Sequence, residues 1–206
     1  SQPEWLGKKV LAAAGVAIPP GDLARSVDEA VAIAERIGFP VAMKAQAAKL
    51  AHKTEAGGVL LNIADAAGVR EAWRKLYDNV KAYNASIALD GVLIEVMSKR
   101  GLEMVVGAKR DPRWGPVIVA GIGGVLIEAI GDVRLMPADL SEEAIIDELL
   151  KLKTAKLLKG FRGSPASDLN AIAKVAIAVG NLMRSNPDIM EIDVNPLMVY
   201  GEGASA

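Results

Sequence analysis

The sequence contains no cysteine and only one histidine among its 206 residues. The lack of cysteine excludes disulfide scaffolds, zinc–cysteine centres and thiol catalysis in this chain. Aromatic residues make up only 4% and the formal net charge is −1, so no nucleic-acid partner is expected. The longest apolar run, residues 171–183, contains Lys174 and Asn181 and is too short to cross a bilayer. We therefore expect a cytoplasmic protein without a membrane partner.

Hydrophobic residues make up 51% of the chain, which is enough for a sizeable core in one large domain or two small lobes. Apolar periodicity, capping residues and turn residues together predict an α+β chain. The predicted helices are 5–14, 26–38, 65–83, 141–150, 154–158 and 168–183. The predicted strands are 39–44, 59–61, 91–97, 102–108, 116–120, 125–128 and 189–200. The later strands follow one another without intervening helices, which indicates antiparallel pairing.

The segment 44–61 contains the single histidine, His52, and the glycine pair Gly57–Gly58. A phosphate-binding loop needs cations to match the anion and a backbone that can approach it closely. The glycines could supply that access. The positive charge could come from three lysines of the segment, Lys44, Lys49 and Lys53. The alternative interpretation is an exposed basic hairpin that carries a surface histidine.

A second glycine-rich stretch, residues 121–124, lies between two apolar runs. Its spacing matches neither a dinucleotide-binding fingerprint nor a Walker A loop. It predicts either a loop whose backbone approaches a ligand or an ordinary glycine-rich hairpin.

A third pattern lies near the C-terminus, where Glu191, Asp193 and Asn195 alternate with apolar residues. Residues two apart on a strand share a face, so these three side chains should project together. Oxygen ligands of this kind suit Mg²⁺, which binds carboxylates together with phosphate oxygens and water. The alternative is the solvated face of an edge strand, a position that would also tolerate Pro196.

Three segments taken in order make the chain recognisable: HKTEAGGV at 52–59, GLEMVVGAKRDPRWGPVIVAGIGGVLIE at 101–128, and EIDVNPLMV at 191–199. Together they resemble the ATP-grasp domain of NDP-forming acyl-CoA synthetases, the family of the ADP-forming acetyl-CoA synthetase β subunits. The resemblance runs over nearly the whole chain.

The resemblance implies a nucleotide site for ATP or ADP with Mg²⁺. Lys44 matches a strand lysine that contacts phosphates, and Lys53 lies in the loop that closes over them. The other implied nucleotide-binding residues are Gly57 and Gly58 in that loop, Glu95, Val96 and Met97 at the hinge (backbone contacts to adenine), Glu103 (ribose), and Gly123 and Gly124. The implied metal ligands are Asp193 and Asn195, with Glu191 as a weaker addition. Glu128 matches an acidic position without an assigned role.

His52 matches a position where some relatives are thought to carry a second phosphorylated histidine. Phosphoryl transfer depends mainly on positioning and charge neutralisation. A histidine nucleophile must be neutral, and the positive charge of Lys53 next to it disfavours the imidazolium. His52 and Lys53 are therefore the candidate catalytic residues. The alternative is that His52 only binds a phosphate or shapes the loop.

The expected architecture is a single α+β ATP-grasp domain, residues 1–206, with nucleotide bound between two lobes. The smaller lobe should span about 20–94, and the larger about 95–206 with the N-terminal helix 1–15. The expected reaction is acid + CoA + ATP giving acyl-CoA, ADP and phosphate, so the chain would be an acid–thiol ligase. The expected partners are the CoA-binding and phosphohistidine-bearing domains or subunit of the same enzyme. In relatives a further aspartate ligand follows the last strand, so the metal site of this chain is expected to be incomplete.

Two other functions stay open. One is a non-catalytic nucleotide-sensing module, because some related domains are fused to protein acyltransferases. The other is an ATP-grasp enzyme of the carboxylate–amine ligase type, which the His52–Lys53 pattern disfavours.

Overall fold

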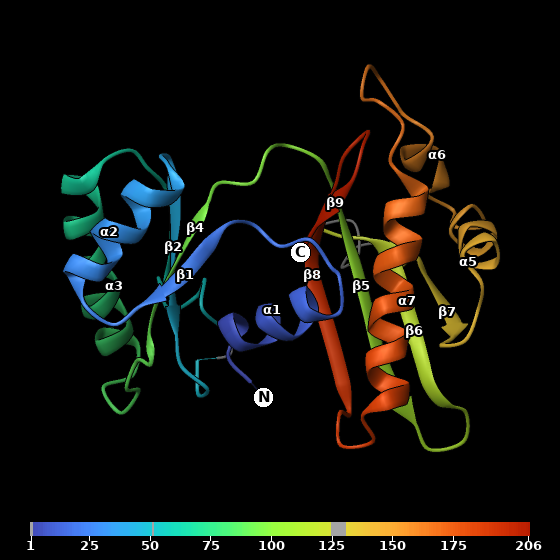
Figure 1. Cartoon of the computed structure of the whole chain (residues 1–206), viewed down its shortest axis with the longest axis horizontal. Coiled ribbons are helices and arrows are strands. Elements are labelled where there is room, and N and C mark those ends of the chain that lie inside the picture. The colour runs from blue at the N-terminus through green and yellow to red at the C-terminus, as the bar shows by residue number, and fades with distance from the viewer. Residues whose placement is uncertain (1, 51, 125–130) are drawn as a thin grey trace. The chain divides into compact units, whose positions relative to one another are not determined.

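The computed structural model describes residues 2–50, 52–124 and 131–206 (Figure 1). Contacts divide the chain into two compact units, each with its own sheet. Unit 1 contains the chain up to Val10 together with Pro19–Ser98, and unit 2 contains Leu11–Ile18 and the chain from Lys99 onward. Antiparallel strands and helices form both units, which confirms the predicted α+β class.

Unit 1 is a four-stranded antiparallel sheet with the strand order β1-β4-β2-β3. The strands are β1 (Gly21–Ala24), β2 (Val41–Gln46), β3 (Val59–Ile63) and β4 (Gly91–Val96). The helices are α2 (Val27–Ile37) and α3 (Ala66–Tyr83), which lie side by side in Figure 1. Strand alternation turns Val41 and Met43 of β2 and Val92 and Ile94 of β4 toward these helices, where they form one apolar cluster. The residues between them on β2 and β4 therefore project their side chains from the opposite face of the sheet.

Polar caps begin both helices of unit 1. The hydroxyl group of Ser26 accepts a hydrogen bond from the N–H of Glu29 at 3.2 Å, and the Glu29 carboxylate accepts from the N–H of Arg25 at 2.7 Å. Asp65 accepts a hydrogen bond from the N–H of Gly68 at 2.8 Å. These bonds satisfy amide groups that a helix leaves without internal partners, which explains why α2 and α3 begin at these places.

The N-terminal helix α1 (Glu4–Ala13) contributes residues to both units, because the boundary falls after Val10. We expected this whole helix to belong with the larger lobe. Its first turn instead packs in unit 1, where the N–H of Trp5 donates a hydrogen bond to the side chain of Gln46 at 3.3 Å. The structure therefore divides the helix where the prediction kept it whole.

Unit 2 is a five-stranded antiparallel sheet with the order β7-β6-β5-β8-β9. The strands are β5 (Leu102–Asp111), β6 (Gly115–Ile122), β7 (Val133–Pro137), β8 (Glu191–Val199) and β9 (Ala204–Ser205). The helices are α5 (Glu142–Leu149), α6 (Ala155–Leu158) and α7 (Leu169–Ser185). The long helix α7 packs against β5, β6 and β8, and Figure 1 shows it running along the sheet.

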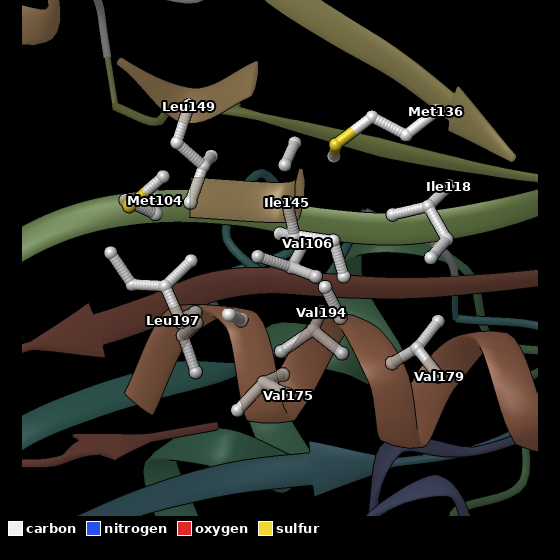
Figure 2. Packing of buried hydrophobic residues seen from close by; sticks show 14 of the residues in the cluster. Met104, Val106, Ile118, Met136, Ile145, Leu149, Val175, Val179, Val194 and Leu197 are labelled. Carbon is white, nitrogen blue, oxygen red and sulfur yellow. The ribbon is translucent and has the colours of Figure 1, made fainter. Parts of the chain in front are cut away.

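The core of unit 2 lies where α5 and α7 meet the sheet. Figure 2 shows side chains from both helices and from β5, β6, β7 and β8 pointing toward one another. The labelled residues are Met104, Val106, Ile118, Met136, Ile145, Leu149, Val175, Val179, Val194 and Leu197. All are at most 6% exposed, so this cluster fixes β8 and β5 in the sheet.

The sequence prediction missed three short strands: β1, β7 and β9. Each has five residues or fewer and little apolar alternation, so pairing with a longer neighbour defines it. The predicted strand 125–128 and Glu128 lie outside the described residues. No described helix is both long and apolar enough to cross a membrane.

Core packing in unit 2 gives a direct stability prediction. Leu149→Ala should lower the free energy of unfolding by about 2–5 kcal/mol, because it removes a fully buried side chain and leaves a cavity. The matched control is Leu135→Ala, whose side chain is 66% exposed, and we expect a change of about 0.5 kcal/mol or less. Urea unfolding of both variants measures the difference, and equal losses would contradict the assigned core.

Candidate functional site

A cluster of charged side chains occupies the face of the unit 1 sheet that lies opposite α2 and α3. Glu95 of β4 pairs with Ala42 of β2, and Lys44 lies two residues farther along β2. Lys44 and Glu95 therefore project from the same face. The Lys44 Nζ lies 2.9 Å from Glu95 Oε2, and the Glu95 side chain is only 4% exposed. The predicted phosphate lysine is thus held by a buried carboxylate.

Glu4, in the first turn of α1, completes this cluster. Its Oε1 accepts a hydrogen bond from Lys44 Nζ at 2.8 Å, and its Oε2 accepts one from Lys53 Nζ at 2.6 Å. Lys8, one turn later, donates to Glu95 Oε1 at 2.5 Å. One carboxylate therefore joins the lysine of β2 to the lysine of the loop after it.

Burial and neighbouring charges shift the pKa values of Glu4 and Lys44 in opposite directions. Burial acts to raise the pKa of Glu4, but the charges and hydrogen bonds of Lys44 and Lys53 outweigh it and lower the pKa to about 2. Burial acts to lower the pKa of Lys44, but Glu4 and Glu95 outweigh it and raise the pKa above its usual value. Both groups are therefore charged at neutral pH.

The turn that carries His52 and Lys53 is closed by its own backbone. The N–H of Ala56 donates to the carbonyl of His52 at 3.1 Å, and the N–H of Gly58 donates to that of Lys53 at 2.7 Å. The N–H of Ala45 in turn donates to the carbonyl of Gly58 at 2.8 Å, which fastens the turn to β2.

Close packing supplies a reason for both glycines of this turn. Gly57 has a φ of +62°, and a Cβ there would lie 2.7 Å from the side-chain nitrogen of Asn79. That nitrogen donates a hydrogen bond to the Gly57 carbonyl at 2.9 Å. A Cβ on Gly58 would lie 3.0 Å from the carbonyl oxygen of Lys53. The two glycines are thus needed to close the turn, and their predicted approach to phosphates stays a prediction.

His52 lies at the start of the turn with its side chain 68% exposed. Its Nδ1 is 3.5 Å from Oε1 of Glu55, three residues later. The ring is therefore open to solvent and has one carboxylate beside one of its nitrogens.

The backbone N–H groups of the predicted hinge residues Val96 and Met97 are already hydrogen-bonded within unit 1. The N–H of Val96 donates to the carbonyl of Pro20 at 2.9 Å, and that of Met97 donates to the carbonyl of Pro40 at 3.3 Å. A nucleobase would therefore have to use carbonyl groups here or replace the longer Met97 bond. The resemblance implied only backbone contacts at Glu95, but the carboxylate of Glu95 is the buried partner of Lys44 and Lys8.

Unit 2 brings Glu103 together with the second glycine loop. The N–H of Gly123 donates to the carbonyl of Glu103 at 2.8 Å. Gly124 has a φ of +64°, and a Cβ there would lie 3.0 Å from Glu103 Oε2. The exposed carboxylate of Glu103 therefore lies over the glycine backbone, so two sets of predicted site residues are neighbours.

The acidic strand behaves as its alternation predicts. Glu191, Asp193 and Asn195 are exposed on β8, while Val194 is buried. Although the residue as a whole is exposed, its carboxyl group is partly shielded from water; this raises the pKa of Asp193, and the negative charge of Glu191 raises it further. A cation would relieve both effects, so these oxygen ligands fit Mg²⁺. Among the described residues, no three His, Cys, Asp or Glu side chains are grouped as a complete metal site.

Sequence reasoning missed Glu4, Lys8 and Asn79. Glu4 and Lys8 are four residues apart on one helix, a spacing that indicates helix stabilisation. Nothing in that spacing indicates contact with Lys44, which lies 40 residues away from Glu4 in the sequence. Asn79 lies within the apolar period of α3 and carries no signal of its own.

Comparisons with known proteins identify the family of the chain. A family model described as an ATP-grasp domain matches residues 2–206. The chain is 50% identical over 206 residues to trans-feruloyl-CoA synthase FCS1 of an unknown prokaryotic organism, covering 99% of this chain and 29% of that protein. It is 36% identical over 199 residues to the ADP-forming acetate–CoA ligase I subunit beta of Pyrococcus furiosus, covering 97% of this chain and 86% of that subunit.

The solved structures include dinucleotide forming acetyl-coenzyme A synthetase 1 of Ca. Korarchaeum cryptofilum. Its complex with coenzyme A, Ca-AMPCP and HgCl⁺ matches with a TM-score of 0.94 and 35% identity, covering 97% of this chain and 87% of that chain. A complex of the same protein with coenzyme A and Mg-AMPPCP matches with a TM-score of 0.83 and 32% identity, covering 97% and 86%. In that complex the phosphohistidine segment points towards the nucleotide binding site.

The buried carboxylate of Glu95 should be essential to unit 1. Glu95→Gln removes the charge that compensates Lys8 and Lys44, so we expect a loss of about 3 kcal/mol in the free energy of unfolding. The control is Asp28→Asn, which removes an exposed ion pair with Arg70 and should cost under about 1 kcal/mol. Chemical denaturation distinguishes the two, and a smaller loss for Glu95→Gln than for Asp28→Asn would contradict the assignment.

The pKa of Asp193 should depend on Glu191. Glu191→Gln removes a neighbouring negative charge that favours protonation of Asp193, so the pKa of Asp193 should fall. Carbon-13 NMR titration of the side-chain carboxyl groups in metal-free protein measures this shift. An unchanged pKa would show that the two carboxylates do not interact.

Proposed function

This chain belongs to the ATP-grasp domain family, in the branch shared by ADP-forming CoA ligases, and from that premise we propose that it is the nucleotide-binding part of an NDP-forming acyl-CoA synthetase. The whole enzyme would convert acid, CoA and ATP to acyl-CoA, ADP and phosphate, in either direction. The chain spans 29% of the length of trans-feruloyl-CoA synthase FCS1. The CoA-binding and phosphohistidine-bearing parts would therefore be other domains or a partner subunit.

The observation that carries this proposal is the pair of lysine ammonium groups that share one carboxylate in unit 1. Lys44 and Lys53 come from a strand and from the turn that follows it, and both reach the two oxygens of Glu4. Two oxygens of a phosphate group could accept the same two hydrogen bonds. Charge-assisted bonds of this kind are the strong contacts in phosphate recognition. Lys44 and Lys53 would therefore bind the phosphates of ATP or ADP.

Unit 2, taken by itself, has oxygen groups that suit a ribose and a metal ion. Glu103 carries an exposed carboxylate over Gly124, where it could accept hydrogen bonds from ribose hydroxyl groups. Asp193 and Asn195 would hold Mg²⁺ through their side-chain oxygens, with Glu191 close by. Mg²⁺, when bound, would neutralise charge on the phosphates. The family resemblance supports these roles, together with the shared exposed face of β8.

His52 would take part in phosphoryl transfer. The carboxylate of Glu55 beside Nδ1 favours a proton on that nitrogen, which leaves the lone pair on Nε2. Nε2 would attack the γ-phosphorus of ATP, forming the N–P bond as the bond to the β–γ bridging oxygen breaks and ADP leaves. The phosphoryl group would then pass to a histidine of the partner domain, which regenerates His52. The reverse sequence makes ATP.

Nucleotide binding is tested by calorimetry of this chain with Mg-ADP. Lys44→Met should weaken binding about tenfold or more, because it removes a charge-assisted hydrogen bond. The matched control is Lys75→Met, an exposed lysine of α3, which should bind like the wild type. Asp193→Asn should weaken binding only when Mg²⁺ is present. If the wild type binds no nucleotide, or if Lys44→Met and Lys75→Met bind alike, the proposed site is wrong.

The histidine relay needs a separate test. The chain is incubated with Mg-ATP labelled at the γ-phosphate, with and without the partner domains of its enzyme. An acid-labile label that His52→Gln abolishes is the expected result. A chain that binds nucleotide but never becomes labelled under either condition would be a nucleotide-sensing module.

A further inference from the structure

The carboxylate of Glu4 lies at the point where three lysine side chains of unit 1 meet. Its oxygens lie 2.8 Å from Lys44 Nζ, 2.6 Å from Lys53 Nζ and 3.5 Å from Lys8 Nζ. These lysines come from β2, from the loop after β2 and from α1 itself. No other described carboxylate contacts both Lys44 and Lys53.

The two acidic residues of this cluster differ in how easily they could be removed. Glu95 lies within β4, is 4% exposed, and contacts both Lys8 and Lys44. Glu4 lies in the first turn of α1 and is 22% exposed. An incoming anion could therefore replace Glu4 by rotation of its side chain, whereas replacing Glu95 would require a change in the sheet.

The charge balance of the cluster favours one anion at a time. Three lysines and two glutamates give a net charge of +1, and without Glu4 the net charge is +2. A phosphate group and a carboxylate both present oxygens that can accept from two ammonium groups, so they compete for the same donors. A ligand of higher negative charge competes more effectively.

We propose that Glu4 occupies the place of a nucleotide phosphate on Lys44 and Lys53 and has to be displaced when nucleotide binds. This inference rests on the proposed function and adds a residue that sets the affinity for nucleotide. Glu4 is an internal competitor that weakens binding of every anion at this place. The cost of displacing Glu4 is the same for each ligand that uses both lysines, so only ligands with enough negative charge to bind Lys44 and Lys53 strongly keep a useful affinity.

The carboxylate of Glu4 stays negatively charged, and so able to compete, throughout the physiological pH range. The lysines lower the pKa of Glu4 to about 2, although burial acts in the other direction. A folded-state pKa below the unfolded value of 4.5 means that the Glu4 contacts are lost only as the pH falls toward 2. Displacement therefore depends on ligand charge and concentration, and pH near neutrality does not control it.

Calorimetry with three ligands tests this inference: Mg-ADP, AMP and inorganic tripolyphosphate. Glu4→Gln should bind tripolyphosphate and Mg-ADP about tenfold more tightly than the wild type, because the competing charge is gone. Its affinity for AMP should rise by a similar factor if the AMP phosphate binds the same two lysines, because each ligand there displaces the same carboxylate. The matched control is Glu71→Gln, an exposed residue of α3 with the same change in net charge, and it should bind like the wild type.

A measurement on the wild-type chain keeps the inference testable if Glu4→Gln does not fold. In a carbon-13 NMR titration, saturation with Mg-ADP should move the pKa of Glu4 upward toward its ordinary value, because the carboxylate leaves the lysines.

The outcomes separate this inference from the proposed function. If the wild type binds Mg-ADP while Glu4→Gln binds it equally or more weakly, the competitor role is wrong and the nucleotide site stands. A Glu4 pKa that nucleotide leaves unchanged would also contradict displacement. If neither protein binds nucleotide or tripolyphosphate, both proposals are wrong.

Discussion

The ion pair between Glu95 and Lys44 is the interaction on which the candidate site in unit 1 depends. Lys44 projects from the face of a sheet and is largely shielded from water. Such burial lowers the pKa of a lysine unless negative charges lie beside it. Glu4 supplies such a charge from α1, and Glu95, buried on the adjacent strand, supplies a second one at 2.9 Å. The charged state of Lys44 is therefore built into the pairing of β2 with β4, and the lysine is ready for an anion before any ligand arrives. Such an arrangement is costly to break by removal of one partner, so the proposed phosphate recognition would depend on the same contacts that stabilise the unit.

The glycines of the two loops serve the protein's own packing as well as any ligand. Gly57 and Gly58 allow the turn to close against Asn79 and the backbone of Lys53, and Gly124 makes room for the carboxylate of Glu103. In the ATP-grasp fold these loops carry the residues implied in nucleotide binding, so the same absence of side chains fixes where Lys53 and Glu103 project. A side chain at any of these glycines would move the neighbouring functional groups, whether or not it touched the nucleotide.

Local patterns made much of this structure predictable from the sequence. Capping residues located the starts of α2, α3 and α5, and alternation on β8 indicated which face Asp193 and Asn195 share. The ordered motifs indicated the ATP-grasp family. Long-range pairing was not predictable, because Glu4 and Lys8 show only a helical spacing and their partners lie 40 or more residues away. Strands β1 and β7 were missed for the same reason, since each is defined by its neighbour.

The acidic strand β8 has one more property. Its second neighbour, β9, pairs only with Met198 and Val199, so among the described residues the first part of β8 has an open edge. An open edge of this kind can recruit a strand from another molecule and begin aggregation. Glu191 and Asp193 place like charges there, and Pro196 has no N–H to offer a new neighbour. The side chains proposed to hold a cation would therefore also keep separate copies of the chain apart.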